Sequence, residues 1–357
     1  MAKKSHINWT DGTWNVITGC TPISPGCANC YASQLAGTRL KHHPSRAGLT
    51  KEVNRHHIWT GEVRFNREWL NQPLRWKKPQ KIFVCAHGDL FHENVSDEWL
   101  NDIFEVMAYA QQHTFQILTK RPDRMSVYLS DLPMILPNVW IGVTVENQKT
   151  ADERIPVLLD TPATKHYLSM EPLLESINIS RWLRNQPGID WIIVGGESGP
   201  NARPMHPNWV RSLRNQCIDA CVPFFFKQWG EWLPAKRDKY GNVEFCDQNS
   251  IPHDGFLKCR VTSLDDKFTA FRFGKKVAGR RLDGKTWDDL PCTPLSRRQI
   301  PSRPLDYGIF PSARMLRRTV WRCRGGIAAE TQKLRGSLQR SGQRYCQFPP
   351  HSPGSSN

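Results

Sequence analysis

Six short apolar runs alternate with amphipathic stretches between residues 81 and 226, and this alternation constrains the fold more than any other feature. The runs are four to six residues long, rich in β-branched and aromatic residues and nearly continuous in hydrophobicity, as strands buried on both faces of a sheet are. Repeated strand–helix units of this kind predict an α/β fold with a parallel sheet. The runs lie at residues 81–85, 114–118, 138–143, 165–169, 190–194 and 223–226.

Helix signals fall in the gaps between these runs. Ser96 stands in the N-cap position before Asp97, and Pro122 and Pro207 stand in the first turns of two further stretches. Both kinds of position favour helix starts. We expect helices at residues 97–112, 122–129, 148–159, 177–185 and 207–220.

A charged residue follows each apolar run within a few positions. Singly, each is typical of a helix cap or a solvated loop. Together they would meet at one edge if the strands form a ring, and α/β barrels place their chemistry at that edge. We therefore predict a partial or full (β/α) barrel, with an open doubly wound sheet as the alternative. The charged residues are Asp89, Lys120, Arg121, Glu146, Glu171, Glu197 and Lys227.

Three cysteines, Cys20, Cys27 and Cys30, lie within eleven residues of a Pro/Gly-bent loop that precedes these units. Three thiolates can hold three irons of a cubane cluster and leave the fourth iron open to a substrate or cofactor. A structural zinc site is the alternative, and it needs a fourth ligand. The spacing alone leaves both metals open. Histidines that could complete a zinc site are His42, His43, His56 and His57.

The charge of the chain is concentrated near its C-terminus. Residues 292–357 hold twelve Lys/Arg against two acidic residues, so they supply +10 of the formal net charge of +16. Their Arg-, Ser- and Pro-rich composition predicts a disordered basic tail. Turn signals in residues 231–291 predict a small β-rich appendage. We therefore expect a barrel domain at 1–230, the appendage at 231–291 and the tail at 292–357.

Cysteine usage and hydropathy indicate the compartment. Eleven cysteines, an odd number, in a chain of 357 residues without an apolar signal region do not suggest a disulfide scaffold. No segment approaches the length of a membrane span. We expect a protein of the reducing cytoplasm without membrane association.

Cations alternate with aromatic residues between positions 64 and 78. This pattern suits nucleic acid, through phosphate contacts and base stacking. The alternative is that the tryptophans pack in the core beneath solvated cations. The predicted nucleic-acid-binding residues are Arg64, Arg67, Trp69, Arg75, Trp76, Lys77 and Lys78.

The chain resembles a phage and prophage three-cysteine family of unknown function, domain-of-unknown-function family 5131, which is similar in fold to radical S-adenosylmethionine (SAM) enzymes. Radical SAM enzymes usually separate their three cysteines by three and then two residues, whereas the gaps here are six and two. The resemblance spans roughly residues 5–291. It is carried by residues 13–20, 24–32, 73–79, 89–91, 118–122, 140–147, 169–173, 194–199, 226–230 and 274–287.

The resemblance implies that the three cysteines hold a [4Fe-4S] cluster whose open iron binds S-adenosyl-L-methionine. Reductive cleavage of SAM would give a 5′-deoxyadenosyl radical that abstracts hydrogen from a substrate in the barrel mouth. The glycine-rich turn after the fifth run lets backbone approach a ligand closely. We expect cofactor contacts from Gly195, Gly196, Glu197, Lys120 and Lys227, and catalytic roles for Glu146, Glu171 and Asp89.

The predicted function is that of a radical SAM-type enzyme that modifies or repairs a nucleic-acid base or nucleoside. The expected partners are a DNA or RNA substrate and an electron-donor protein. Two alternatives stay open. One is a zinc-stabilised nucleic-acid-binding phage protein without catalysis, and the other is an accessory module to a separately encoded enzyme.

Overall fold

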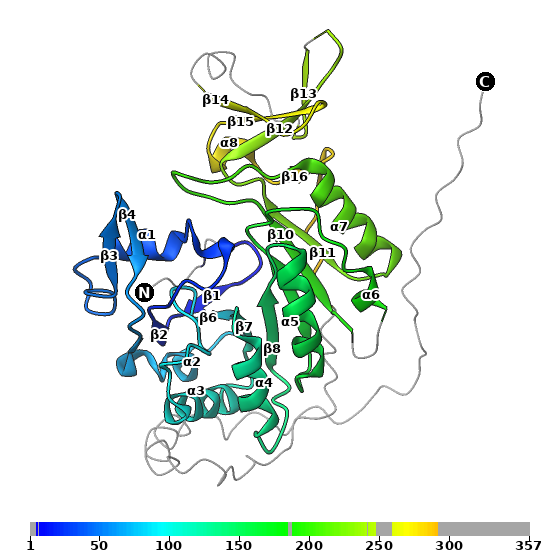
Figure 1. The fold of residues 1–357 in the computed structure, drawn as a ribbon. Coiled ribbons are helices and arrows are strands. Elements are labelled where there is room, and N and C mark those ends of the chain that lie inside the picture. The colour runs from blue at the N-terminus through cyan, green and yellow to red at the C-terminus, as the bar shows by residue number, and fades with distance from the viewer. Residues whose placement is uncertain (1–4, 6, 185–187, 241, 248–258, 292–357) are drawn as a thin grey trace, which may run out of the picture. The chain divides into compact units, whose positions relative to one another are not determined.

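A seven-stranded parallel sheet forms the centre of the molecule (Figure 1). The computed structural model describes residues 5, 7–184, 188–240, 242–247 and 259–291. The strands lie side by side in chain order, so each crossover connects neighbours, as in a (β/α) barrel. No strand of the described residues joins the two outer strands, so the barrel is partial. The strands are β1 (Gly12–Trp14), β6 (Lys81–Val84), β7 (Thr114–Thr119), β8 (Val139–Thr144), β9 (His166–Met170), β10 (Trp191–Gly195) and β11 (Phe224–Gln228).

One face of the sheet packs against the crossover helices. Side chains such as Ile117, Ile141 and Leu168 share a single buried cluster with Phe104 and Ile155 of the helices. The Ser96 side chain caps the first of these helices by accepting a hydrogen bond from the backbone N–H of Trp99. The helices are α3 (Asp97–Tyr109), α4 (Pro122–Ser130), α5 (Gln148–Asp160), α6 (Ser180–Leu183) and α7 (Pro207–Asp219).

The other face of the sheet is filled by aromatic rings. Trp9, which precedes β1, lies against Phe83 of β6 with ring centroids 4.8 Å apart and against Trp191 of β10 at 6.0 Å. Trp140, Tyr167, Ile193 and Phe225 complete this buried cluster. The interior of the partial barrel is therefore a packed core, and any ligand must bind at an edge of the sheet.

Eight short elements lie between β1 and β6 in the described chain. β2 (Ile17–Thr18) pairs with β5 (Arg64–Phe65), and β3 (Thr50–Val53) pairs with β4 (His56–Trp59) as an antiparallel hairpin. The remaining elements are η1 (Pro25–Cys27), α1 (Tyr31–Gly37), η2 (Arg67–Trp69) and α2 (Gln72–Arg75).

Residues after β11 form a four-stranded antiparallel sheet in the order β13-β12-β15-β14. This sheet is the β-rich appendage expected from the turn signals. A small hairpin and a short helix follow it. The elements are β12 (Trp232–Arg237), β13 (Val243–Phe245), β14 (Arg260–Ser263), β15 (Phe268–Arg272), α8 (Lys275–Ala278), β16 (Arg281–Leu282) and β17 (Lys285–Thr286).

The sequence-based fold class is confirmed as a partial barrel, and all six apolar runs form strands of the sheet. One predicted helix was wrong in length, because 177–185 reduces to Ser180–Leu183. The basic tail at 292–357 lies outside the described residues, and the three domain boundaries stay a prediction. None of the helices in the described part of the chain combines the length and hydropathy needed to cross a bilayer.

Candidate functional site

The carboxyl edge of the sheet carries the charged residues that follow the strands, and the cysteine loop lies against this edge. The loop leaves β2 at Gly19, which bridges to Gly88 beyond β6. Gly19 has φ +96°, and a Cβ there would lie 2.1 Å from the carbonyl oxygen of Glu62. Only glycine fits this conformation and this close approach.

Cys20, Cys27 and Cys30 are free thiols and are partly buried. Burial, followed by the charge of Asp89, raises the pKa of Cys20 to about 12, and Cys30 and Cys27 add to this rise while Arg121 opposes it.

Side chains from three strand ends hold the loop in place. Arg121, after β7, donates from Nη1 to Cys20 Sγ at 3.7 Å. Ser24 donates to Glu146 Oε1, after β8, at 2.8 Å. Asn29 donates to Glu197 Oε2, after β10, at 3.0 Å. These contacts fix the cysteine loop across the carboxyl ends of β7, β8 and β10.

Glu146 is the most buried carboxylate of this edge, with no exposed surface. Its carboxylate is paired with Lys120, and Oε2 lies 3.2 Å from Nη1 of Arg154. Burial alone would raise the pKa of Glu146, but Lys120 and Arg154 outweigh it and lower that pKa. A Cβ on Gly26 would lie 2.6 Å from Cγ of Glu146, so the loop backbone rests directly on this side chain.

Asp89 is also buried, and both of its oxygens accept hydrogen bonds. Oδ1 accepts from Thr119 Oγ1 at 2.7 Å, and Oδ2 accepts from Nη1 of Arg121 at 3.1 Å. Asp89 thereby orients Arg121, which in turn contacts Cys20.

Glu171, after β9, contacts two residues of β11. Its Oε2 lies 2.6 Å from Nζ of Lys227, and its Oε1 accepts from Nε2 of Gln228 at 3.1 Å. A Cβ on Gly195 would lie 3.3 Å from the Glu171 carboxyl carbon. Both ionised side chains of this pair keep some solvent exposure, in contrast to Glu146.

The glycine-rich turn after β10 has a packing role and an electrostatic one. A Cβ on Gly196 would lie 2.0 Å from the carbonyl oxygen of Trp229, so the two backbones could not approach as they do. Glu197 is buried and forms an ion pair with Arg203 at 2.6 Å. Arg203 also donates to the Pro25 carbonyl at 3.0 Å, which adds a further tie to the cysteine loop.

An iron–sulfur cluster and a zinc ion need different sets of protein ligands. Among the described residues no three His, Cys, Asp or Glu side chains are already grouped as a metal site. Three free thiols on one anchored loop match the chemistry of a cluster with three protein ligands. Two of the four histidines that could complete a zinc site have other contacts, His43 with Ser45 at 2.7 Å and His56 with Asn201 at 2.7 Å.

Sequence reasoning missed His92, Arg154 and Arg203. His92 is buried, and its Nε2 lies 2.8 Å from Oγ1 of Thr21 in the cysteine loop. Arg154 reaches Glu146 from within α5. A charged residue on the buried face of α5 was a usable signal for Arg154, whereas nothing local marked the other two.

The predicted nucleic-acid-binding residues do not form one group with the cysteine loop. Trp76 lies against His113, with ring centroids 6.0 Å apart, just before β7 begins. This places residues 75–78 at the amino edge of the sheet, because they lead into β6 at Lys81. Trp69 lies under Arg46, whose guanidinium is 5.5 Å from the ring centroid. Arg64 donates to the Ala47 carbonyl at 2.9 Å, and Arg67 lies over the Phe65 ring.

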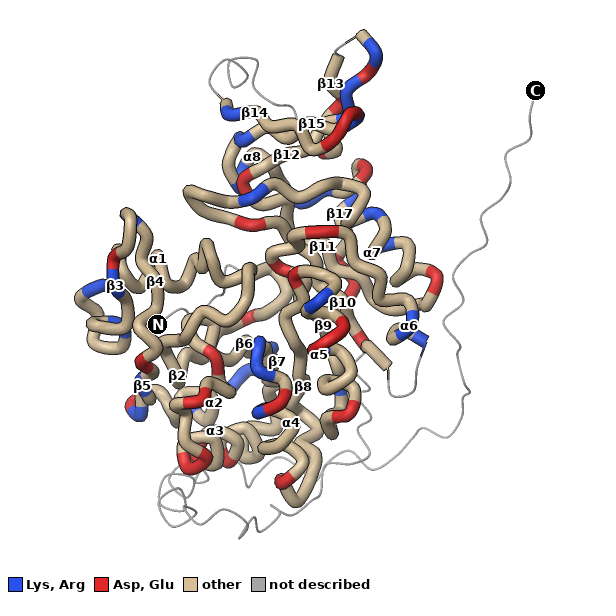
Figure 2. The backbone as a smooth tube through the Cα atoms, viewed as in Figure 1, with Lys and Arg blue, Asp and Glu red and all other residues tan. Residues whose placement is uncertain are grey.

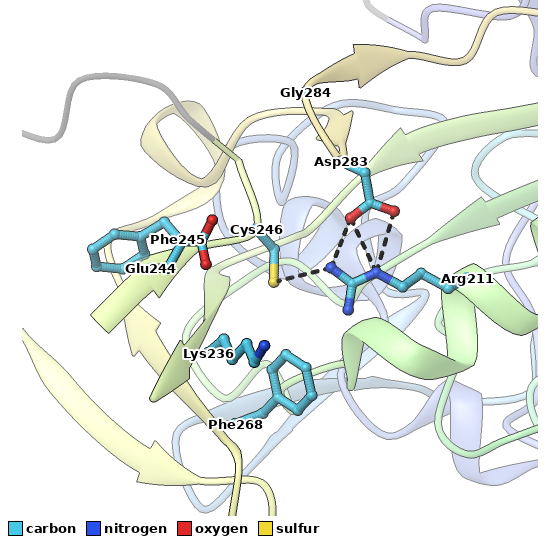
Figure 3. Close-up of a pocket in the computed structure, with 8 residues that line it drawn as sticks. All are labelled: Arg211, Lys236, Glu244, Phe245, Cys246, Phe268, Asp283 and Gly284. Carbon is cyan, nitrogen blue, oxygen red and sulfur yellow. Dashed lines mark hydrogen bonds and ion pairs between the residues drawn. The ribbon is translucent and has the colours of Figure 1, made fainter. Parts of the chain in front are cut away.

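A separate cavity of about 460 Å³ lies between α7 and the appendage sheet (Figure 3). Arg211 is paired with Asp283 at 2.6 Å and donates to Cys246 Sγ at 3.8 Å. Burial raises the pKa of Cys246 to about 11, although Arg211 opposes the rise. A protonated thiol beside an already paired guanidinium gives this cavity no evident reactive group.

The family described as "Protein of unknown function (DUF5131)" matches residues 4–291. No curated protein matches the chain. Two solved structures are similar to it: spore photoproduct lyase complexed with dinucleoside spore photoproduct, and a mutant of spore photoproduct lyase. Each is 8% identical, with a TM-score of 0.34, over 73% of this chain and 67% of the other.

Proposed function

The chain belongs to the DUF5131 family, and from its geometry we propose that it is a radical SAM-type iron–sulfur enzyme that acts on a nucleic-acid base or nucleoside. The observation that carries the proposal is the placement of the cysteine loop. Arg121, Glu146 and Glu197 tie this loop across the carboxyl ends of three parallel strands. That edge is where (β/α) barrels place their reactive groups.

Cys20, Cys27 and Cys30 would hold a [4Fe-4S] cluster. When bound, the cluster and SAM supply radical chemistry in which a hydrogen atom is taken from the substrate. The protein positions the ligands, and Glu146 and Glu197 do so by bonding Ser24 and Asn29 of the loop. Asp89 acts through Arg121, whose positive charge faces Cys20 and offsets thiolate charge.

The predicted cofactor contacts divide into two roles. Lys227 pairs with Glu171, a predicted catalytic residue; both side chains are partly exposed, and Glu171 lies beside the Gly195 backbone. They are suited to the amino and carboxylate groups of SAM, since each ion can bind the opposite charge. Lys120 and Glu197 instead support the site, because each belongs to an ion pair whose carboxylate is buried, and Gly196 does so through its close approach to the Trp229 carbonyl.

The substrate and the redox partner belong to the same proposal. A nucleic-acid base would be the substrate, and an electron-donor protein would supply the electron that the radical chemistry requires. Of the predicted catalytic carboxylates Glu146 and Glu171, Glu171 is the more exposed and is better placed to exchange a proton.

The test is release of 5′-deoxyadenosine from SAM by protein purified without oxygen and reduced with dithionite. We expect release by the wild type and by Cys221→Ala, which removes an exposed thiol remote from the loop. Cys27→Ala should abolish it. No release by cluster-loaded wild type, or equal release by both variants, would contradict the proposal.

A further inference from the structure

A second cavity, of about 310 Å³, opens directly beside the cysteine loop. It lies where three segments meet: the end of the loop with α1, the β3–β4 hairpin, and the turn after β10. Asn29 and Tyr31, which flank Cys30, line it together with Leu35, His56 and Asn201. This volume is typical of small-ligand sites.

The walls of the cavity offer an aromatic ring that is held in place. The Tyr31 side chain is 51% exposed. Its hydroxyl donates to the Ala86 carbonyl at 2.9 Å, and its ring meets His87 edge-on at 6.2 Å. A ring fixed at two points loses little conformational entropy when a flat ligand stacks on it.

Side-chain amides and an imidazole border the same cavity. Asn29 donates to the Asn201 carbonyl at 2.9 Å, and the Asn201 amide lies 2.7 Å from Nε2 of His56. This chain of contacts joins the loop, the turn and the hairpin. Amide groups beside an aromatic face are the groups that recognise the edges of unpaired bases.

The chain segment that supplies two of the three walls of the cavity is cationic. Residues 31–61 contain five Lys/Arg and four His but a single acidic residue, Glu52. Four of the cations are exposed, and Figure 2 shows mostly blue segments around β3 and β4. Two of them are adjacent in sequence to residues that line the cavity: Arg39 follows Thr38, and Arg55 precedes His56. We name this group the cationic rim: Arg39, Lys41, Lys51 and Arg55.

We propose that this cavity binds an unpaired nucleotide of a single-stranded nucleic acid, with the base against Tyr31 and the flanking phosphates on the cationic rim. A base stacked within a duplex cannot enter a cavity of this kind, so the strand must present it unpaired. The inference rests on the proposed function for the role of the bound base: if the protein is the proposed enzyme, this base is its substrate, because the cavity adjoins Cys30.

Fluorescence anisotropy with a labelled 12-nucleotide DNA, the same sequence as RNA, and the DNA as a duplex tests the proposal. The rim variant is Lys51→Gln with Arg55→Asn, since position 55 has φ +63°, which Asn tolerates. Its matched control is Arg237→Gln with Lys239→Gln, two exposed cations at the end of β12. All proteins keep residues 292–357, so differences arise from the substitutions alone.

We expect the rim variant to bind either single strand about tenfold more weakly, with a shallower salt dependence, and the control to stay within about twofold of the wild type. Tyr31→Leu should bind a single strand about tenfold more weakly, because the ring on which the base stacks is removed. Tyr31→Phe should keep the ring and most of the affinity. If Tyr31→Leu does not fold, the rim variant alone decides. Binding of DNA, RNA or both as single strands supports the proposal.

Three results would overturn it: equal losses in the rim variant and its control, duplex binding as tight as single-strand binding, or no loss in a folded Tyr31→Leu. These outcomes are independent of the cluster. A protein without iron that still shows the rim and Tyr31 effects would refute the proposed enzyme but support this binding site. An iron–sulfur protein that shows neither effect would refute the binding site but leave the proposed enzyme standing.

Discussion

The two edges of the partial barrel use carboxylates for different purposes. At the amino edge, Asp11 accepts from the backbone N–H of Lys81 at 2.7 Å, and Asp190 accepts from that of His166 at 2.8 Å. Each of these contacts caps the start of the neighbouring strand. At the carboxyl edge, Glu146 and Glu197 instead bond side chains of the cysteine loop.

The comparison shows that only one edge is built around an inserted segment. Capping contacts at the amino edge satisfy backbone groups that any strand start exposes. The carboxyl edge contains buried ion pairs, which are costly to assemble and add little net stability. These pairs lie beneath the cysteine loop and bond it directly, and we propose that they position it.

The largest expected effect is that of Glu146→Ala. It leaves Lys120 and Arg154 without their shared buried partner, and breaking a buried pair costs about 3–5 kcal/mol in the free energy of unfolding. Urea denaturation measures this loss. The control is Glu153→Ala, an exposed carboxylate of α5, which should cost less than about 0.5 kcal/mol. Similar losses in both variants would show that the buried ion pairs of the carboxyl edge matter no more for stability than an exposed carboxylate does.

Gly196→Ala comes next. The new Cβ would overlap the Trp229 carbonyl oxygen, which is backbone and cannot move freely, so we expect a loss of about 1–3 kcal/mol. Gly195→Ala meets only the end of the Glu171 side chain and should cost less. Thermal unfolding of the two variants compares them, and an equal or reversed order would show that the turn after β10 does not pack as described.

A smaller effect concerns pH. Burial, and then the charge of Arg46, lowers the pKa of His87 at the carboxyl edge from 6.5 to about 4. The unfolded chain therefore binds more protons between these values, so stability falls as the pH drops from 6.5 towards 4. His87→Gln should flatten that part of the stability curve. A variant with an unchanged slope would mean that His87 is not held neutral by the fold.

The smallest effect is expected at the amino edge. Lys77 and Lys78 are exposed there, away from the proposed chemistry. Neutralising both to Gln should lower single-strand affinity by no more than about threefold. A loss as large as that of the cationic rim would instead favour the segment around residues 64–78 as the nucleic-acid interface.

Much of the fold was predictable because buried parallel strands leave a continuous apolar pattern. The strands at β6 to β11 were located within about two residues. β1 was harder to place, since a three-residue strand with Gly and Thr has no such pattern. The apolar spacing of residues 177–185 predicted a longer helix than α6, because a single turn is enough to bury Trp182 and Leu183.

The site was predictable in its parts but not in its connections. Strand order alone brings Glu146 and Glu197 to the edge that holds the loop. Their bonds to Ser24 and Asn29 span more than a hundred residues, and no local pattern encodes such pairings. The cationic rim was missed because its charges are separated in the sequence by histidines and by part of the β3–β4 hairpin.

The metal content of protein purified without oxygen tests the central claim most directly, since all proposed chemistry depends on the cysteine loop. We predict about four irons and four sulfides per chain, with absorption near ~400 nm, in the wild type and in Cys221→Ala. Cys20→Ala should lose them. A wild-type protein that binds one zinc per chain and contains no sulfide would contradict the account.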